Sequence, residues 1–351
     1  MPPDTHSLLD AENIRHLLAE WFAGAGRDLP WRRFPEPYSV LVSEFMLQQT
    51  QVSTVIPYFE RWMQRLPSLR HLAEASEETL LGLWQGLGYY SRARNLQKTA
   101  REVFARFGGV LPEDPSQLRS LPGIGPYSAD AIAAFAFDRP APAVDANIAR
   151  VLARLTHMET PVDSKAGALH IQRIATALLP EQGGGRLHTS ALMELGALVC
   201  LPKKPKCLLC PLKTHCRAPQ PELLPRKSPR KPTLFIEERA AWCVQEDKVL
   251  LEQQTGRRSR GLWKLPPLTS VPEDEPLFRT VYPFTHHRVT LFVHAAPPPS
   301  SAGASQRWFA LATVLEEAAL PAGHRRALGF LVEKSSTAHS FPDRSLPNWP
   351  A

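Results

Sequence analysis

The sequence predicts a multidomain protein, with an all-α domain in the first part of the chain and a smaller α+β domain after it. In residues 9–200, apolar side chains recur at helical spacing and strand-like alternation is scarce. Residues 218–232 are basic and rich in proline, as expected for a semi-rigid linker. Beyond them, short β-branched or aromatic runs are bounded by Gly, Pro and Asp, which is typical of strands.

Individual elements can be placed within this division. The apolar spacing predicts helix through residues 38–52, and Asp114, Pro115 and Gln117 have the pattern of a capped helix start. Strands are expected at 233–244, 248–253 and 287–294, with helices near 311–319 and 324–333. We therefore expect a first domain at 1–217, the linker at 218–232, a second domain at 233–334 and a disordered tail at 335–351.

The charge of the chain is concentrated in one window. The 351 residues include 41 Lys and Arg against 34 Asp and Glu, a net charge of +7. Residues 201–232 hold nine basic residues and one acid, so the rest of the chain sums to about −1. A local basic segment of this kind favours contact with a polyanion, although a solvated, Lys-rich linker would have the same composition. No apolar run approaches the roughly 20 residues of a membrane helix, and the N-terminus lacks a signal-peptide pattern. We expect a cytoplasmic protein.

Four of the five cysteines are clustered inside or beside this window. The spacing Cys200-x6-Cys207-x2-Cys210-x5-Cys216 can close on one metal centre, and both zinc and an iron–sulfur cluster accept four thiolates. Lys203, Lys204 and Lys206 lie in the first loop, where the closed site would present them to phosphates. The fifth, Cys243, lies in a strand-like run and is interpreted as a core residue.

A glycine-rich turn separates two helical patterns at Leu121–Gly125. Gly123 and Gly125 permit a sharp hairpin whose backbone N–H groups, at the start of the next helix, can hold a DNA phosphate without reading sequence. An ordinary turn between two helices explains the same residues.

Two carboxylates are candidates for acid–base chemistry. Glu44 has Val40 and Leu41 on one side of its helical face and Leu47 on the other, which predicts desolvation and a raised pKa. Asp145 immediately precedes an apolar helical stripe, where it can cap the helix and stay ionised. A solvated Glu and a purely structural cap are the simpler readings. A protonated donor paired with an ionised stabiliser is the pattern expected for cleavage of a glycosidic bond.

Polar and aromatic residues flank this region. Gln48, Gln49 and Thr50 begin four residues after Glu44, and Tyr89 follows Gly86-Leu87-Gly88. Residues of these types can fill a gap left in a base stack, although buried structural roles are equally compatible with them.

Taken together, these blocks resemble the helix–hairpin–helix DNA glycosylase superfamily, and within it the MutY family of adenine DNA glycosylases. The resemblance covers nearly all of residues 10–330. It rests on Leu29–Arg32, Ser43–Thr50, Gly86–Tyr90, Leu121–Tyr127, Val144–Arg150 and the four-cysteine spacing.

The resemblance implies a base-excision-repair enzyme. It implies that adenine mispaired with 8-oxoguanine is flipped from double-stranded DNA and removed by hydrolysis, with a [4Fe–4S] cluster on the four cysteines. Glu44 matches the general acid and Asp145 the residue that stabilises the cationic sugar. Other positions match the base pocket, namely Arg27, Trp31, Arg32, Tyr127 and Asn147, while Gln49 and Tyr89 match residues that enter the DNA stack. The protein would act as a monomer in the cytoplasm, at the nucleoid.

The second domain resembles the Nudix-like module of this family. Gly261–Pro266 matches its core signature, and Phe284, Thr285 and His286 match the loop that contacts 8-oxoguanine. A Nudix hydrolase would need a Glu-rich helix to hold magnesium, and no such run follows Trp263, so a pyrophosphatase is rejected.

Two alternative functions share part of this pattern. An endonuclease III-like lyase has the hairpin, the aspartate and the cluster, but it needs a Schiff-base lysine where this chain has Tyr127. A non-enzymatic iron–sulfur DNA-binding protein would leave Glu44 and Asp145 unexplained.

The chain departs from the family pattern at two positions. Ala146 stands where the family has Gly after the catalytic aspartate, and Ser190 stands where relatives place Gln or Glu against the adenine. The second departure puts the role of Ser190 in doubt.

Overall fold

The chain folds into two compact units that do not follow the sequence boundary. The computed structural model describes residues 10–229, 232–256, 260–268, 270, 272–284 and 286–339. Unit 1 comprises Met1–Ala75 and Arg94–Arg230, and unit 2 comprises Ser76–Ala93 and Lys231–Ala351. A segment from the first half of the chain thus belongs to the unit formed by the second half.

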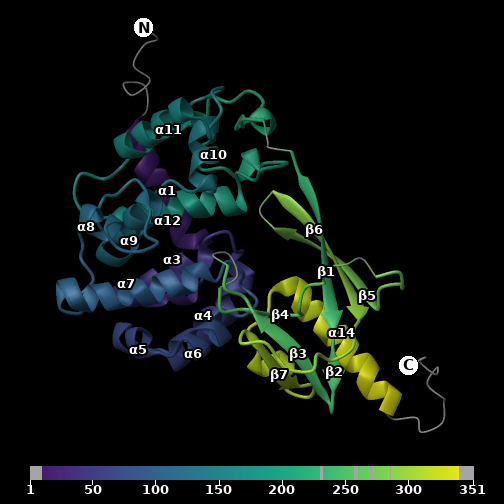
Figure 1. Cartoon of the computed structure of the whole chain (residues 1–351). Coiled ribbons are helices and arrows are strands. Elements are labelled where there is room, and N and C mark those ends of the chain that lie inside the picture. Colours follow the sequence, from purple (N-terminus) through teal and green to yellow (C-terminus); the bar gives the residue numbers. More distant parts are fainter. Residues whose placement is uncertain are drawn as a thin grey trace. The chain divides into compact units, whose positions relative to one another are not determined.

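Unit 1 is built from helices, as the apolar spacing predicts (Figure 1). Its helices, including nearly all of α7, are α1 (Ala11–Ala25), α2 (Pro30–Arg33), α3 (Pro37–Leu47), α4 (Val52–Arg65), α5 (Leu69–Glu74), α7 (Ser91–Phe107), α8 (Pro115–Arg119), α9 (Pro126–Phe137), α10 (Ala146–Leu155), α11 (Lys165–Ala177) and α12 (Gly185–Leu198). Three short 3₁₀ turns follow α12, namely η2 (Cys207–Leu209), η3 (Lys213–His215) and η4 (Pro221–Leu223).

Caps and breaks in the sequence explain the helix boundaries. The predicted start of α8 is confirmed, because the Asp114 carboxylate accepts bonds from the backbone N–H groups of Ser116 and Gln117. The helix expected through residues 38–52 is wrong in one respect. α3 ends at Leu47 and α4 begins at Val52, because Gln49 adopts a left-handed backbone conformation with φ 58° that no helix accepts.

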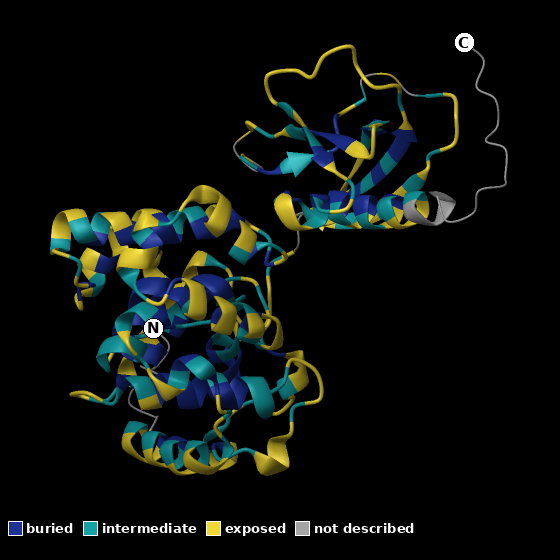
Figure 2. Cartoon of the chain, turned by 90° about the horizontal axis from the view of Figure 1, so that it is seen from below, coloured by how far each residue is buried: buried dark blue, intermediate teal, exposed yellow. Residues whose placement is uncertain are grey.

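The core of unit 1 is formed by α1, α10, α11 and α12. Ile14 and Leu18 of α1 pack with Leu152 of α10, Ile171 of α11 and Leu195 of α12. A second buried helix, α3, packs against α9 and α4, and its residues from Ser39 to Met46 are all buried. Figure 2 shows this burial as dark blue runs along the interior helices. A polar residue on α3 is therefore removed from bulk water.

The residues predicted as a linker are held on unit 1 over most of their length. The Arg226 carbonyl accepts a bond from the Val162 backbone N–H, and Ser228 bonds to the Asp163 carboxylate through its N–H and its hydroxyl. Arg226 also pairs with Glu159 at 2.9 Å. The proline-rich segment is therefore anchored through Ser228.

Unit 2 combines two small sheets with helices. Its elements are α6 (Glu77–Trp84), β1 (Leu234–Trp242), β2 (Val244–Gln245), β3 (Lys248–Gln253), β4 (Trp263–Lys264), β5 (Phe278–Phe284), β6 (His287–Ala295), β7 (Gln306–Ala310), α13 (Val314–Glu317) and α14 (Ala322–His339). In one sheet the order is β1-β6-β5, with β1 parallel and β5 antiparallel to β6. In the other, β3 pairs with β2, β4 and β7.

The strands and helices expected in this region are confirmed, but three strands, β4, β5 and β7, were not predicted. α14 packs on β5, and together with α13 it covers a core that includes Val249, Leu251 and Val293. α14 continues to His339, five residues into the segment expected as a tail. None of the described helices is long and apolar enough to cross a bilayer.

The segment Ser76–Ala93 is tied to unit 2 by side chains at its end. The Gln85 amide donates to the carbonyl of Ala318, and the Tyr90 hydroxyl donates to the carbonyl of Leu320, each at 3.3 Å. These two bonds hold the predicted Gly-rich turn at 86–88 on the segment that joins α13 to α14.

Candidate active site

A large cavity in unit 1 gathers most of the predicted site residues. Its volume is about 1100 Å³, and it is lined from the α1–α2 loop, α2, α3, the turn at 48–51, α9, α10 and α12. The predicted residues that line it are Arg27, Trp31, Arg32, Glu44, Gln48, Gln49, Thr50, Tyr127, Asp145, Asn147 and Ser190. The cavity is large enough to hold a purine nucleotide.

Glu44 is buried on α3, as its apolar neighbours predicted, and only 5% of it is exposed. Burial raises the pKa of its carboxyl from 4.5 to about 7, and the nearby charge of Asp145 acts in the same direction. A hydrogen bond from Tyr127 opposes this rise because it stabilises the ionised form. Glu44 is therefore poised to give or take a proton near neutral pH.

Asp145 is both a helix cap and a cavity residue. Its Oδ1 accepts the backbone N–H of Ile148 at 2.7 Å, and its Oδ2 accepts the Asn147 amide at 2.8 Å. Burial raises the pKa of Asp145, although these bonds to the ionised form pull it down. The capping role is confirmed, but burial outweighs the expected effect of the helix N-terminus on ionisation.

Asn147 connects Asp145 to the cysteine loop. The Asn147 side-chain oxygen accepts a bond from Arg150 at 2.8 Å, and Arg150 also donates to the carbonyls of Gly196 and Cys200 at the same distance. Asn147 is therefore held at both ends of its amide. Ala146 begins α10.

One important residue of the cavity was missed by sequence reasoning. Glu194 of α12 is fully buried and accepts hydrogen bonds from both Arg27 and Arg32. Burial alone would raise the pKa of Glu194, but the bonds from the two arginines outweigh it and the pKa is lowered. The signal was present, because Glu194 interrupts an apolar helical run as Glu44 does.

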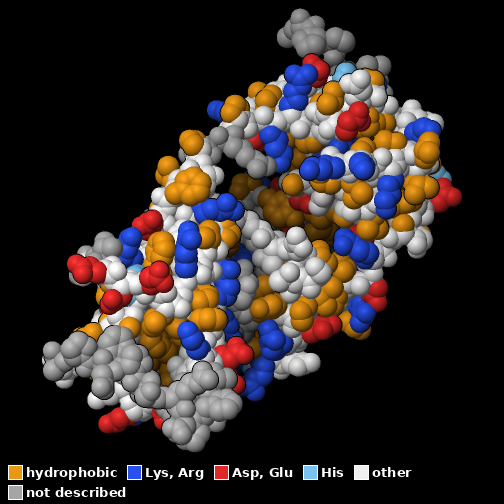
Figure 3. Space-filling view, turned by 90° about the vertical axis from the view of Figure 1, so that its right-hand side faces the viewer, with side chains coloured by type: hydrophobic (Ala, Val, Ile, Leu, Met, Phe, Trp, Pro, Cys, Tyr) orange, Lys and Arg blue, Asp and Glu red, His pale blue; other side chains and the backbone are white. Residues whose placement is uncertain are grey.

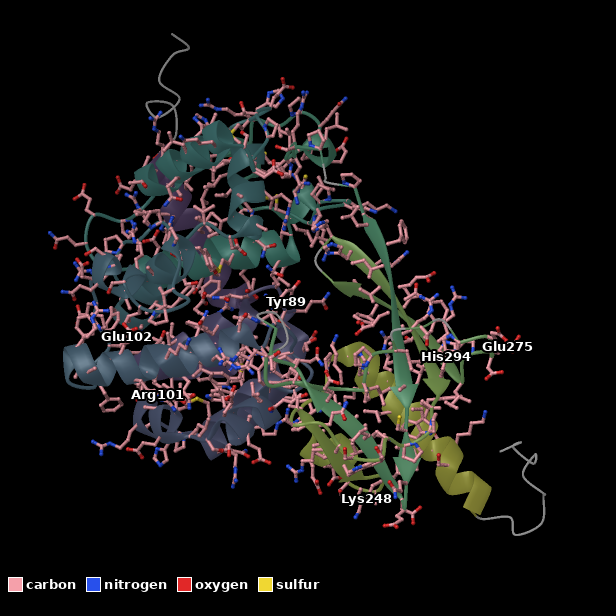
Figure 4. All side chains as sticks on the ribbon, viewed as in Figure 1. Tyr89, Arg101, Glu102, Lys248, Glu275 and His294 are labelled. Atoms are coloured by element: carbon pink, nitrogen blue, oxygen red, sulfur yellow. The ribbon has the colours of Figure 1, made fainter. Side chains whose placement is uncertain are left out.

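One residue in the turn after α3 and one in the loop after α6 adopt the same unusual backbone conformation. Gln49 (φ 58°) and Tyr89 (φ 47°) both adopt the left-handed conformation that L-residues rarely take. Gln49 is exposed at the cavity, and Tyr89, labelled in Figure 4, is 46% exposed in unit 2. Strained, exposed polar and aromatic side chains of this kind concentrate at functional sites.

The glycine-rich hairpin has the predicted form. Gly123 has φ 77°, and a Cβ there would lie 2.7 Å from the Cβ of Asn95, so only glycine fits. Ile124 is buried beneath the turn, while Gly123 and Gly125 are exposed. Their backbone is therefore accessible at the N-terminus of α9.

The four clustered cysteines line a second cavity, of about 280 Å³. None of them forms a disulfide, and the buried guanidinium of Arg154 donates to the Cys200 sulfur at 3.2 Å. Among the described residues, no group of three or more His, Cys, Asp or Glu is arranged to hold a metal ion. Four thiols around one cavity, with a cationic donor at Cys200, have the donor chemistry of a site for a thiolate-bound metal group.

Other predicted positions line neither of these two cavities. Lys203, Lys204 and Lys206 are exposed on the first loop of the cysteine segment. Figure 3 shows Lys and Arg side chains among hydrophobic ones on the face that it displays. Cys243 is 4% exposed and packs with Ala241 and Leu250, which confirms it as a core residue.

The predicted loop of the second domain lies between β5 and β6. Phe284 ends β5 and His286 lies in the turn before β6, while Thr285 lies outside the described residues. Within the expected core signature, the ring of Trp263 packs edge-on against that of Phe309, with 4.9 Å between the ring centroids. The Nζ of Lys264 lies 2.8 Å from Oε1 of Glu238.

Comparison with known proteins places the chain in a family. Residues 42–176 match the model of the HhH-GPD superfamily base excision DNA repair protein. The adenine DNA glycosylase of Mus musculus is 36% identical over 324 residues, which cover 76% of this chain and 62% of the mouse protein. That of Mycolicibacterium smegmatis is 42% identical over 201 residues, 57% of this chain and 67% of the relative. The chain thus spans about three fifths of the length of the mouse protein.

Solved structures share the helical part. A thermostable thymine-DNA glycosylase aligns with a TM-score of 0.53 and 25% identity, over 59% of this chain and 95% of that one. Endonuclease III in a non-covalent complex with DNA aligns with a TM-score of 0.51 and 26% identity, over 60% of this chain and 96% of that one. The cavity carboxylates and the hairpin agree with these sequence relatives. The chain belongs to the adenine DNA glycosylase family of the HhH-GPD superfamily.

Proposed function

We propose that this protein is a DNA glycosylase that hydrolyses the N-glycosidic bond of adenine mispaired with 8-oxoguanine or guanine. The observation that carries the proposal is the pairing of Glu44, with a pKa of about 7, and the capped Asp145 in one cavity. A flipped adenine would enter this cavity, which both carboxyls line.

The two carboxyls have separate roles in this proposal. Glu44 donates its proton to the purine, which becomes a better leaving group, and the ionised Glu44 then accepts a proton from the attacking water. Asp145 stabilises the positive charge that develops on the sugar as the bond breaks. Tyr127 and Asn147 hold the two carboxyls through hydrogen bonds.

Tyr127 also argues against a lyase. An endonuclease III-like lyase would need a lysine amine there to form a Schiff base, and a phenol cannot do so. The reaction proposed is therefore hydrolysis alone, and the related fold of endonuclease III does not favour the alternative.

DNA would be held away from the reacting bond. The exposed backbone at Gly123 and Gly125 suits a phosphate, as do the three lysines of the cysteine loop. Gln48, Gln49 and Thr50 at the cavity, and Tyr89, would occupy the stack that the flipped adenine leaves. Ser190 would line the base pocket.

We further propose a [4Fe–4S] cluster on Cys200, Cys207, Cys210 and Cys216. The shared cavity and the Arg154 bond to Cys200 support a thiolate-bound group there. Such a cluster would rigidify the loop that presents the lysines. Its chemistry is not needed for the hydrolytic step.

For the second domain we propose a Nudix-like fold that recognises 8-oxoguanine. Phe284, Thr285 and His286 would contact the damaged base, and substitution Thr285→Ala should weaken the preference for 8-oxoguanine over guanine. The protein would act on double-stranded DNA as a monomer in the cytoplasm.

Single-turnover excision tests the main proposal. The wild-type protein should release adenine opposite 8-oxoguanine, less well opposite guanine and least opposite cytosine. Glu44→Gln and Asp145→Asn should each bind the mispair but lose most of the excision. An inactive wild-type protein, or variants that lose binding as well, would contradict the roles assigned here. Borohydride trapping of a DNA adduct would instead support a lyase.

A further inference from the structure

The buried carboxylate of Glu194 forms a compact network with two arginines at the cavity wall. Its Oε1 accepts the backbone N–H and the Nε–H of Arg27, at 3.1 and 2.5 Å, and its Oε2 accepts Nη2–H of Arg27 at 3.1 Å. Nη2 of Arg32 donates to the same Oε2 at 2.9 Å. All four bonds converge on one side chain that has no solvent exposure.

The arginines are held differently. Arg32 is fixed at both ends of its guanidinium, because its Nη1 donates to the Arg27 carbonyl at 3.1 Å. Arg27 gives Nε and Nη2 to Glu194, and within the part of the chain that the structure describes its Nη1 has no hydrogen-bond partner. The Arg27 side chain is 37% exposed and lines the cavity.

The location of Arg27 makes the restraint necessary. Arg27 lies in the short loop between α1 and α2, where a long side chain has many rotamers. A bidentate pair with a buried carboxylate fixes the plane of a guanidinium as well as its position. Glu194 therefore converts a mobile cation into an oriented hydrogen-bond donor.

The orientation has a chemical consequence for a purine in the cavity. A guanidinium only donates hydrogen bonds, so a fixed Nη1 requires an acceptor nitrogen on the base. Adenine has acceptor ring nitrogens on each of its edges. When the purine lies against Glu44, which lines the same cavity, a bond from Nη1 to the ring nitrogen that faces it would hold the purine in that pose.

We propose that Glu194 is a positioning residue, which fixes Arg27 so that its free nitrogen orients the flipped adenine for protonation. This inference rests on the glycosylase function proposed above. It assigns to Glu194 no contact with the substrate, and no proton transfer.

A double-mutant cycle tests the coupling. Glu194→Gln and Arg27→Met should each slow single-turnover excision of adenine opposite 8-oxoguanine by about a hundredfold, the cost of a slightly misplaced reactant. The double variant should be no slower than Arg27→Met, because Glu194 acts through Arg27. Multiplying losses, or an unchanged rate in Glu194→Gln, would overturn the proposal.

A binding measurement separates positioning from a general structural role. A duplex with an abasic site opposite 8-oxoguanine has no base for Arg27 to hold, so all variants should bind it within about twofold of wild type. Weakened binding to this duplex in parallel with excision would mean that Glu194 supports only the fold. Glu102→Gln is the matched control and should leave both measurements unchanged, because Glu102, labelled in Figure 4, forms only an exposed pair with Arg106 on α7.

Arg27→Lys covers the case in which Glu194→Gln fails to fold. Lysine keeps the charge but cannot form the bidentate pair, so excision should fall nearly as far as in Arg27→Met. A wild-type rate in Arg27→Lys would refute the need for an oriented donor. Failure of the proposed function would be recognised separately, because the wild-type protein itself would not excise adenine.

Discussion

The pH dependence of excision follows from the environment of Glu44. Only the protonated carboxyl can give a proton to the purine, so the first-order rate of excision should be constant well below pH 7, reach half of its maximum near pH 7 and fall further above it. The test is to change the pH from 6 to 9 while all of the DNA stays bound to the protein. Excision is then limited by the fraction of Glu44 that carries a proton.

The magnitude comes from the burial of the carboxyl. A pKa raised from 4.5 to about 7 corresponds to about 3 kcal/mol of preference for the protonated form. At pH 7 about half of the protein then carries the proton, and at pH 9 about one hundredth, so the rate should fall by roughly fiftyfold between these two pH values. With an ordinary pKa, only about one molecule in 300 would be protonated at pH 7.

Rapid-quench measurements at saturating protein, from pH 6 to pH 9, would determine the profile. Tyr127→Phe removes a hydrogen bond that stabilises ionised Glu44, so its pKa should rise and the decline should begin at higher pH. A rate that is flat to pH 9, or a decline that moves to lower pH in Tyr127→Phe, would refute this account of Glu44.

Three further predictions concern stability and the cysteine loop. His188 is buried, and this burial, together with the charge of Arg15, lowers the pKa of its imidazole from 6.5 to about 4. Because the unfolded chain binds a proton at His188 more readily than the folded protein does, the folded protein should lose about 3 kcal/mol of stability as the pH falls from about 6.5 to 4. His188→Phe should remove that slope in urea unfolding at pH 5 and pH 7.5, whereas the exposed His71→Gln should keep it. Gly123→Ala should lower the melting temperature, because its Cβ would collide with Asn95, while Gly125→Ala has free space and should not; equal melting temperatures would contradict the hairpin geometry. Cys210→Ser should lower bound iron and sulfide in purified protein, and Cys243→Ser should not.

Much of the site could be predicted because its signals are local. Glu44 was found from the apolar neighbours one turn away, and Asp145 from its place before an apolar stripe. Both signals depend on helical periodicity, which a single sequence displays directly. The hairpin was visible because Gly123 occupies a backbone conformation that excludes side chains.

The rest depends on contacts between distant segments. Glu194 meets Arg27 across 167 residues, and no local pattern reveals that pairing. The break after Leu47 was missed because Gln49 is not a glycine, although its backbone is left-handed. β5 contains Pro283 and β4 has two residues, so both gave a weak strand signal.

The assignment of Ser76–Ala93 to unit 2 has a consequence for the order of folding. During synthesis α6 leaves the ribosome long before residues 314–339 exist, so the carbonyls that receive Gln85 and Tyr90 are not yet made. Unit 2 can close only when nearly the whole chain has been translated, which requires a loop of more than a hundred residues to be bridged. An N-terminal fragment that stops before Lys231 would carry α6 and its turn without their partners throughout its lifetime.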